Sequence, residues 1–589
     1  MGISLKKIII QNFKAFKEEQ CIDMSDFSIF MGANSSGKST ALQALLILKQ
    51  TIESNSPNID LLLSGKYVTL GTYEDICNSE DKNVSIGISI KDDSASEECD
   101  EANEEYRIRW SFSENQEKNG HVKLVRIDLN NQECNMSMEL QEDELYHISI
   151  DQKETKYAIK INNLLFREMY VLYDSGINEM FAEFLQDILD CLRTENTKNV
   201  RISKQEMVFQ NSLDKFYSSL FKIYQKEESE IDELDDLSEE IKKSCVRNLL
   251  TLISEFSVAQ LGDEVEFLFP SEVIENVLVE LINTKEKMEN INSIISKYRK
   301  LNRKEKIGEL RKEVINDRIF IFKTVDKRKD KKSELDYMLL FRKKYIEVCK
   351  NIFGGIFYVG PLRESPQGLY NIGFESIPKY VGPTGAYFAS VLLSEKTKRN
   401  FVLPDGTIES MRLSEALNEW VYYINVADTV SVEQSNSFGF NVHVSNTQQV
   451  SSDIMNVGIG TSQVLPVLIT GLMAEKGETV IFEQPELHLH PFSQSRLADF
   501  FIAIAQNGCK VIVESHSEYL VLRIRYYIAA KKIDADMIRL NFFQNIGGTV
   551  VKQGNLTDAG FLEYPEDFVD ETQKLLNDIL AARFKKGLS

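Results

Sequence analysis

The sequence feature that most constrains the fold is a glycine-rich loop in the segment FSIFMGANSSGKSTALQALLILKQ. Gly32–Ser39 has the form G-x-x-x-x-G-K-S, between the apolar run Phe27–Met31 and an amphipathic helix pattern. Two glycines allow a backbone to curl around an anion without a Cβ clash. Strand, loop and helix in this order predict a phosphate-binding loop in an α/β domain. A chance glycine-rich turn is the alternative, and the order of the three elements argues against it.

The residues of this loop have different predicted roles in nucleotide binding. Lys38 would neutralise charge on the β- and γ-phosphates, and the Ser39 hydroxyl would bind Mg²⁺. Upstream, Phe13 and Phe16 either support the base or ribose of the nucleotide or belong to the core. The residues predicted to bind ATP in the loop are Gly32, Ala33, Asn34, Ser35, Ser36, Gly37, Lys38, Ser39 and Thr40.

Two apolar segments far along the chain end in acidic residues. They are TVIFEQPELHLHP, from Thr479, and KVIVESHSEYL, from Lys510, and each predicts a buried strand. A carboxylate at the tip of a strand that neighbours the phosphate loop can hold Mg²⁺, which makes Glu483 the predicted metal ligand beside Ser39. The alternative is a buried strand capped by surface acids.

Three histidines lie in the same two segments. His516 follows the second strand, where it would contact the γ-phosphate or the attacking water, although a single histidine is more often structural. His488 and His490 are interpreted as turn residues, because no further ligand lies at metal-binding spacing.

A further glycine-containing turn lies in NVGIGTSQVLPVL. Gly460, Thr461, Ser462 and Gln463 precede or begin an apolar helix pattern, and a helix N-terminus can receive phosphate, here from a second subunit. This signal is weak when taken alone.

The chain divides into regions of different periodicity. Residues 1–162 alternate apolar and polar positions outside the loop and helix, which predicts an antiparallel β-subdomain within the first lobe. Residues 163–350 show helical spacing and predict a long α-helical insertion. Residues 351–536 alternate strand and helix patterns, which predicts a second lobe with a parallel sheet. Residues 537–589 are predicted to hold strands and a tail.

Charge and cysteine content limit the partners. The net charge of -22 and the pI of about 5.0 exclude a protein that binds nucleic acid through its overall charge. Residues 297–344 have a local excess of Lys and Arg, which is either a solvated helix face or a surface for nucleic acid. The eight cysteines form no CxxC pair, and no apolar stretch approaches the roughly 20 residues that span a bilayer. These features predict a cytoplasmic protein with no membrane partner.

Several blocks of the sequence resemble a known class of proteins. GANSSGKS, VGIGTSQ, FEQPELHLHP and ESHSEYL, in this order, resemble the ABC-type ATPase heads of the RecF, SMC and OLD class. SGKYVTLGTYED, YVGPLRE, YVGPTGA and GFLEYPEDFVDETQKLL are most similar to the bacterial subgroup that includes the PtuA ATPase subunits of Septu anti-phage systems. The resemblance covers about residues 1–160 and 351–589. It implies an α/β ABC-type P-loop head in two lobes.

The resemblance also implies roles for the motifs. The phosphate loop would be the Walker A motif, and Gly460 to Gln463 the signature segment that acts across a dimer. Glu483 would be the Walker B acid and His516 the switch histidine. Two ATP molecules, each with Mg²⁺, would lie between two heads of a homodimer, and higher oligomers are left open.

One position departs from the pattern of these heads. Many of them carry a glutamate after the Walker B acid as general base, and this chain has Gln484. A carboxamide can orient water but cannot take its proton. Either Glu486 supplies the base, or hydrolysis is slow and ATP acts mainly as a clamp. Slow hydrolysis is the favoured interpretation.

Three functions follow from these predictions. The first is the ATPase subunit of an anti-phage complex that controls a separately encoded nuclease, expected to be of HNH type. The second is a RecF- or SMC-like DNA repair or maintenance ATPase that contacts DNA through the basic part of the insertion. The third is a nucleotide-gated scaffold. The segment after His516 is too short for a nuclease domain, so the chain itself is expected not to cut nucleic acid.

Overall fold

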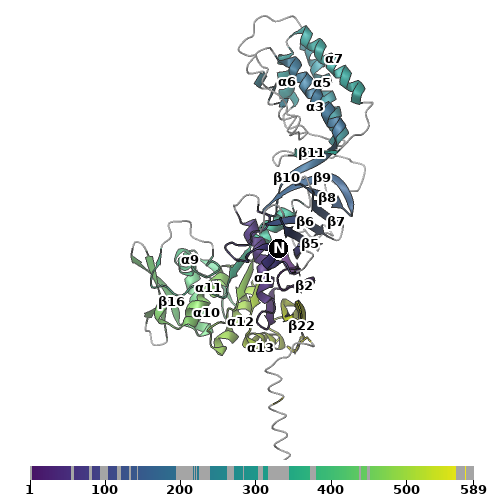
Figure 1. Ribbon diagram of the computed structural model, residues 1–589. Helices are drawn as coiled ribbons and strands as arrows, with labels where there is room; N and C mark the ends of the chain where they lie inside the picture. Colours follow the sequence, from purple (N-terminus) through teal and green to yellow (C-terminus); the bar gives the residue numbers. More distant parts are fainter. Residues whose placement is uncertain are drawn as a thin grey trace, which may run out of the picture. The chain divides into compact units, whose positions relative to one another are not determined.

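The computed structural model divides the chain into two compact units, which Figure 1 shows as a ribbon. Unit 1 comprises Met1–Asn135 and Ile346–Ser589, and unit 2 comprises Met136–Tyr345. The structure describes residues 3–54, 59–78, 83–92, 104–115, 121–131, 134–141, 144–193, 216–217, 219–220, 222–223, 239–261, 271–282, 284–302, 310–315, 342, 344–371, 380–436, 439–446, 451–565 and 578.

Unit 1 contains a seven-stranded sheet that carries both ends of the predicted site. Five neighbouring strands are parallel, and two further strands extend the sheet in antiparallel pairing. In spatial order the strands are β12 (Ile356–Val359), β19 (Thr479–Glu483), β20 (Lys510–Glu514), β3 (Phe27–Gly32), β21 (Ile538–Asn545), β22 (Thr549–Leu556) and β23 (Leu562–Glu563). All five residues of β19 are buried, and strands buried on both faces lack apolar–polar alternation. The predicted parallel sheet is confirmed.

Helices connect the strands of this sheet and bring distant segments into one core. They are α1 (Lys38–Ile52), α11 (Ile459–Met473), α12 (Pro491–Gln506) and α13 (Glu518–Ala529). Phe501 of α12 packs against Phe27 of β3 and Phe482 of β19, with ring centroids 5.8 and 5.4 Å apart. This aromatic cluster joins β3 to β19, which lie far apart in the sequence.

The alternating segments of the N-terminal region form antiparallel strands, as predicted. In unit 1 these strands are β1 (Ile3–Gln11), β2 (Gln20–Asp23), β4 (Val84–Asp92), β5 (Glu104–Glu114) and β6 (Val122–Asn130). Trp110 of β5 is fully buried and lies edge-on to Phe353, which follows the insertion in the sequence. The core of unit 1 therefore includes residues that precede unit 2 in the sequence and residues that follow it.

Smaller elements complete unit 1. They are α2 (Tyr73–Ile76), the π-helical turn η2 (Cys349–Phe353), β13 (Tyr370–Asn371), α9 (Phe388–Ser394), β14 (Arg399–Val402), β15 (Ile408–Met411), α10 (Leu413–Ile424), β16 (Thr429–Asn436), β17 (Gly439–Ser445), β18 (Ser451–Asp453), η3 (Ile454–Asn456) and η4 (Ala535–Met537). Trp420 of α10 is buried and donates a hydrogen bond from Nε1 to the carbonyl of Val402 at 2.9 Å. This contact secures the β14–β15 hairpin to α10.

Unit 2 contains helices and antiparallel strands. The helices are α3 (Ser175–Leu192), α5 (Glu239–Leu261), α6 (Ser271–Leu281) and α7 (Lys285–Asn302), which Figure 1 shows side by side. The strands are β7 (Asn135–Leu140), β8 (Tyr146–Ile150), β9 (Lys153–Asn162), β10 (Leu165–Asp174) and β11 (Leu310–Ile315). Tyr298 of α7 packs on Phe184 of α3, and its hydroxyl donates to Asp187 at 2.9 Å.

The insertion differs from the helical prediction at two places. Leu165–Asp174 and Leu310–Ile315 are strands, so the interpretation of residues 163–350 as uniformly helical is wrong there. β9 and β10 are joined by Asn163 and Leu164, both with positive φ (51° and 60°), as a two-residue hairpin turn requires. The sequence lacks the usual Asn-Gly signal at this turn, which explains the error.

Two predicted features fall outside the described residues. Most of the basic stretch 297–344 lies there, including Arg303, Lys304 and Lys306, and so does most of the tail after Pro565. The described part of the chain nevertheless has the predicted fold class. It is an α/β fold with a mainly parallel sheet, an antiparallel β-subdomain and a helix-containing insertion.

Candidate functional site

The phosphate loop follows β3 and leads into α1, as predicted. Gly32 and Gly37 have φ values of +146° and +104°, which side chains with a Cβ rarely adopt. A Cβ on Gly32 would lie 2.3 Å from the carbonyl oxygen of Phe543, and one on Gly37 would lie 2.4 Å from Thr549 Oγ1. Both glycines are therefore required by neighbours from β21 and β22 as well as by the loop itself.

Lys38 and Ser39 at the start of α1 lie against a carboxylate from β20. Lys38 Nζ donates to the carbonyls of Gly32 (3.1 Å) and Ala33 (2.8 Å), and it lies 4.0 Å from Glu514 Oε1. Ser39 Oγ donates to Glu514 Oε2 at 2.8 Å. The ammonium group is thus held in the mouth of the loop, where an incoming phosphate would meet it.

The order of the strands corrects the expected neighbour of β3, and the predicted role of Glu483 as a metal ligand stays a prediction. We expected β19 to neighbour the phosphate-loop strand, but β20 lies between β19 and β3. The acid bonded to Ser39 in the described hydrogen bonds is therefore Glu514, which is paired in register with Glu483. Glu483 itself accepts a hydrogen bond from the Tyr358 hydroxyl at 2.8 Å.

Both buried carboxyl groups at this edge of the sheet bind a proton more tightly than an exposed glutamate does. Burial, together with the nearby Glu514 carboxylate, raises the pKa of Glu483 to about 7, and the hydrogen bond from Tyr358 opposes this shift. Burial also raises the pKa of Glu514, opposed by Ser39 and Lys38. Burial lowers the pKa of Lys38, and the charges of Glu514 and Glu486 partly offset this shift. Excess negative charge at this edge of the sheet favours a bound cation.

Gln484, Glu486 and His516 lie around the same edge. Gln484 has φ +44°, and its backbone N–H donates to the carbonyl of Glu514 at 2.8 Å. Glu486 is buried and accepts from the backbone N–H of His516 at 2.8 Å. His516 itself is exposed, and partial burial and the charge of Lys38 lower its pKa. The structure therefore brings these three predicted residues together with the phosphate loop.

The predicted signature segment begins α11. Thr461 Oγ1 donates to the carbonyl of Val426 at 3.0 Å, and Ser462 Oγ donates to that of Ile459 at 2.9 Å. Gln463 Nε2 donates to the carbonyl of Glu364 at 3.4 Å. These three side chains are buried within unit 1, and a Cβ on Gly460 would lie 2.5 Å from the His488 carbonyl oxygen. Their predicted role across a dimer stays a prediction.

Other candidate residues have structural roles. Phe13 and Phe16 are fully buried, so they belong to the core. His490 caps α12, where Nδ1 accepts from the backbone N–H of Phe492 at 3.2 Å, and His488 has φ +64°. Among the described residues, no group of three or more His, Cys, Asp or Glu side chains is arranged to hold a metal ion.

The oxygen atoms at the site nevertheless fit Mg²⁺ bound together with a nucleotide. Magnesium in nucleotide sites takes one or two carboxylates, with phosphates and water in the remaining positions. Ser39, Glu514 and Glu483 supply a hydroxyl and two carboxylates beside the glycine cradle.

Sequence reasoning missed four residues that support the site. Glu514 was recognised only as part of a polar strand end, and Thr549 donates from Oγ1 to the carbonyl of Ser36 at 2.9 Å. Tyr358 and Arg363 belong to YVGPLRE, and Arg363 Nη2 donates to the carbonyl of Glu483 at 2.8 Å. Two signals in the sequence could have revealed Tyr358 and Arg363. They are a tyrosine hydroxyl near the end of an apolar run and an arginine shortly after that run.

The fold and the site together define a P-loop ATPase that binds a nucleotide. The family is shown by a sequence match over residues 4–356 and 392–521 to the AAA_15 model, whose description is AAA ATPase domain. The chain belongs to this family.

Solved structures include distant matches to SMC head domains. One is the Pyrococcus furiosus head with an extended coiled coil, bound to the C-terminal domain of ScpA. It has 12% identity and a TM-score of 0.32, with 98% of this chain and 99% of that chain covered. The Thermotoga maritima head has 7% identity and a TM-score of 0.30, with 93% and 98% covered. Identities and TM-scores as low as these assign no function to this chain. No curated protein sequence matches the chain.

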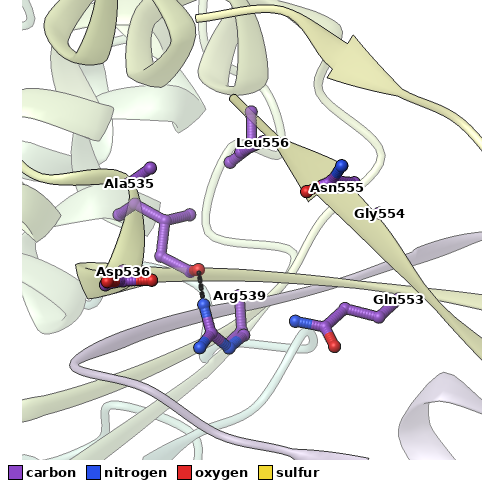
Figure 2. Close-up of a pocket in the computed structure, with 8 residues that line it drawn as sticks. Ala535, Asp536, Arg539, Gln553, Gly554, Asn555 and Leu556 are labelled. Atoms are coloured by element: carbon purple, nitrogen blue, oxygen red, sulfur yellow. Dashed lines mark hydrogen bonds between the residues drawn. The ribbon is translucent and has the colours of Figure 1, made fainter. Parts of the chain in front are cut away.

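A separate polar cavity of about 400 Å³ lies beside β21 and β22 (Figure 2). It is lined by Asp536, Arg539, Gln553 and Asn555 among others, and Arg539 Nη1 donates to the carbonyl of Ile538 at 3.1 Å. None of its lining residues was predicted to bind nucleotide. In the described part of the chain, no helix is both long and apolar enough to cross a bilayer.

Proposed function

We propose that this protein binds and hydrolyses ATP as a subunit of a bacterial anti-phage defence complex, and that it regulates a separately encoded nuclease. The observation that carries the ATPase part is the contact of Lys38 and Ser39 with Glu514, beside Glu483. Two segments at opposite ends of the sequence thereby supply one set of phosphate and magnesium ligands. The defence role rests on the resemblance of the sequence blocks to Septu ATPase subunits.

In this proposal, Mg²⁺ binds Ser39 and Glu483, with Glu514 as an additional ligand, and the Walker A residues hold the triphosphate. Residues Gly460 to Gln463 contact the ATP of a second head in a homodimer. Gln484 cannot accept a proton, so turnover is slow, and Glu486 is the remaining candidate base. His516 contacts the γ-phosphate. The eight cysteines are scattered along the sequence and form no CxxC pair, which supports a cytoplasmic location.

Phosphate release tests the ATPase part. Wild type should show slow Mg²⁺-dependent turnover, and Lys38→Ala should abolish it because the β- and γ-phosphates lose their cation. Glu486→Gln separates the two interpretations of the base. A strong loss of turnover supports Glu486, whereas an unchanged rate excludes it. Wild-type protein that binds ATP without any turnover would support the nucleotide-gated scaffold instead.

Affinity purification of the native complex tests the defence part. An HNH-type nuclease that co-purifies with the protein, and whose gene is adjacent, would support the proposal. Co-purified DNA in a replication or repair context would favour the RecF- or SMC-like alternative. That alternative also predicts salt-sensitive DNA binding that is lost on charge reversal at Arg303, Lys304 and Lys306.

A further inference from the structure

We propose that Arg363 is a positioning residue for Glu486, and that these two side chains bind the water molecule that attacks the γ-phosphate. The inference rests on the proposed ATP hydrolysis and adds a residue and a ligand to that site. Arg363 follows β12 in the segment YVGPLRE, far in sequence from the Walker A and Walker B motifs.

Arg363 fixes the backbone turn that follows β19. Its guanidinium belongs to a residue that is only 7% exposed, and Nη2 donates to the carbonyls of Glu483 (2.8 Å) and Gln484 (3.2 Å). Gln484 is a non-glycine residue at φ +44°, a conformation that needs support from its surroundings. The hydrogen bond from its N–H to the Glu514 carbonyl holds the turn from the other side.

Both charged groups keep unused hydrogen-bonding atoms. Among the described residues, Arg363 Nε and Nη1 have no hydrogen-bond partner, and neither does Glu486 Oε2. Glu486 is 6% exposed, and its other oxygen accepts from the His516 N–H. A buried donor or acceptor without a partner destabilises the folded protein, so these atoms indicate a ligand.

The charge of Glu486 acts both on Arg363 and on groups of the phosphate-loop site. Burial lowers the pKa of Arg363 to about 10, and the Glu486 carboxylate is the largest influence in the opposite direction. The charge of Glu486 also acts on Lys38 and on Glu514. Glu486 therefore lies within electrostatic range of the group expected to meet the γ-phosphate.

A water molecule matches these unused atoms better than a phosphate oxygen does. Water accepts from one Arg363 N–H group, which leaves a lone pair for the attack, and donates to Glu486 Oε2, whereas a phosphate oxygen would meet the carboxylate as a like charge. A buried water needs two to four polar partners, and Nε, Nη1 and Oε2 are buried polar atoms whose hydrogen-bonding capacity is unused.

The step that follows balances with these groups alone. The water oxygen forms a bond to the γ-phosphorus, and the bond from this phosphorus to the β–γ bridging oxygen breaks. ADP leaves with the electron pair, and the water proton passes to Glu486 Oε2, from which it returns to the released phosphate or to solvent. Arg363 stays protonated throughout.

The test compares Arg363→Gln, Arg363→Lys, Glu486→Gln and the Arg363→Gln/Glu486→Gln double variant in the full chain. We expect Arg363→Gln and Glu486→Gln each to lower kcat by about 100-fold or more, with the Kd for ATP and Mg²⁺ changed less than about 3-fold. The double variant should be no slower than the slower single variant, because the two side chains act on one water. Arg363→Lys keeps the charge and should retain an intermediate rate.

Amide hydrogen exchange supplies a readout that does not depend on activity. Without nucleotide, Arg363→Gln should speed exchange in residues 484–489 by about 10-fold or more, because the turn loses the two hydrogen bonds that Arg363 donates to it. Arg523→Gln is the control, since Arg523 is paired with Asp499 away from the loop. It should leave exchange in this turn and kcat unchanged.

The possible failures are distinguishable. A wild-type protein without turnover ends the proposed hydrolysis and this inference with it. If the wild type is active, then an unchanged kcat in Arg363→Gln, or losses that multiply in the double variant, overturns the inference alone. If Arg363→Gln does not fold, Arg363→Lys decides, and a wild-type kcat and wild-type exchange in that variant overturn the inference.

Discussion

The phosphate loop positions a ligand with backbone atoms, whereas the acidic edge of the sheet, at the ends of β19 and β20, uses side chains from distant segments. Gly32 and Gly37 are needed for their backbone conformations, and both belong to the single short segment Gly32–Ser39. Tyr358, Glu483 and Glu514 instead lie on three strands, β12, β19 and β20. The comparison teaches that a local motif can be complete in sequence while its catalytic counterpart is assembled only by the sheet.

Substitution of a loop glycine should have the largest effect. Gly32→Ala introduces a Cβ that meets the Phe543 carbonyl oxygen at 2.3 Å, so the loop or β21 must move. We expect ATP affinity to fall by about 100-fold or more, equivalent to about 3 kcal/mol. Equilibrium binding of a fluorescent ATP analogue measures this change.

Gly406→Ala is the matched control for that prediction. Gly406 also has positive φ (+85°), but a Cβ there meets nothing within 4 Å. It should cost about 1 kcal/mol of stability and leave ATP affinity unchanged. Equal losses of affinity in both variants would show that the crowding around Gly32 is not what matters.

In the absence of nucleotide and metal, the acidic edge of the sheet should lower the free energy of unfolding by an amount that depends on pH. The pKa of Glu483 is raised to about 7 from its ordinary 4.5, so the folded protein binds its proton more tightly than the unfolded chain does. The stabilisation from the protonated carboxyl is complete below about pH 4.5 and is lost as pH rises through about 7. Glu483→Gln should therefore gain up to about 3 kcal/mol relative to wild type between pH 5 and 8.

Thermal unfolding in a metal chelator measures this difference. Glu475→Gln, at an exposed acid, is the control and should follow wild type at every pH. A wild type and a Glu483→Gln variant whose Tm values differ by the same amount at pH 5 and pH 8 would contradict the raised pKa. Mg²⁺-dependent phosphate release should meanwhile be lost in Glu483→Gln.

Tyr358→Phe should have an intermediate effect on the same edge. It removes the 2.8 Å hydrogen bond to Glu483 Oε1 and leaves the carboxylate less well oriented. Hydrogen bonds to charged groups contribute about 1.5–3 kcal/mol, so we expect a loss of about 10-fold in kcat/KM at limiting Mg²⁺. Tyr67→Phe removes a similar bond to Glu53, away from the loop, and should leave the kinetics unchanged. Equal effects of the two variants would argue against a specific role for Tyr358.

Thr549→Val should have the smallest effect, and it tests whether a side chain of β22 stabilises the conformation of the phosphate loop. The variant keeps the shape of the side chain and removes the hydrogen bond to the Ser36 carbonyl. A neutral hydrogen bond contributes about 0.5–1.5 kcal/mol, so ATP affinity should fall about 2- to 10-fold. Thr251→Val removes a comparable bond to Arg247 in unit 2 and should not change ATP affinity. Unchanged affinity in Thr549→Val would mean that the loop is self-sufficient.

Much of the fold and half of the site could be predicted from local patterns. The strand β3, the loop and α1 follow one another without a break, and β19 and β20 are short apolar runs with polar ends. The sequence patterns did not predict the hairpin of β9 and β10, because neither of its two turn residues, Asn163 and Leu164, is a glycine. A turn of this kind is stabilised by the pairing of its strands, which local composition does not report.

By itself, the sequence determined that a phosphate loop forms at Gly32–Ser39, because glycine backbones and neighbouring residues suffice to make it. Only the tertiary structure decided that β20 lies between β19 and β3, so that Ser39 bonds Glu514, and that Arg363 supports the turn at Gln484. Strand order depends on how distant apolar surfaces pack together, and that free energy is not encoded in any one segment.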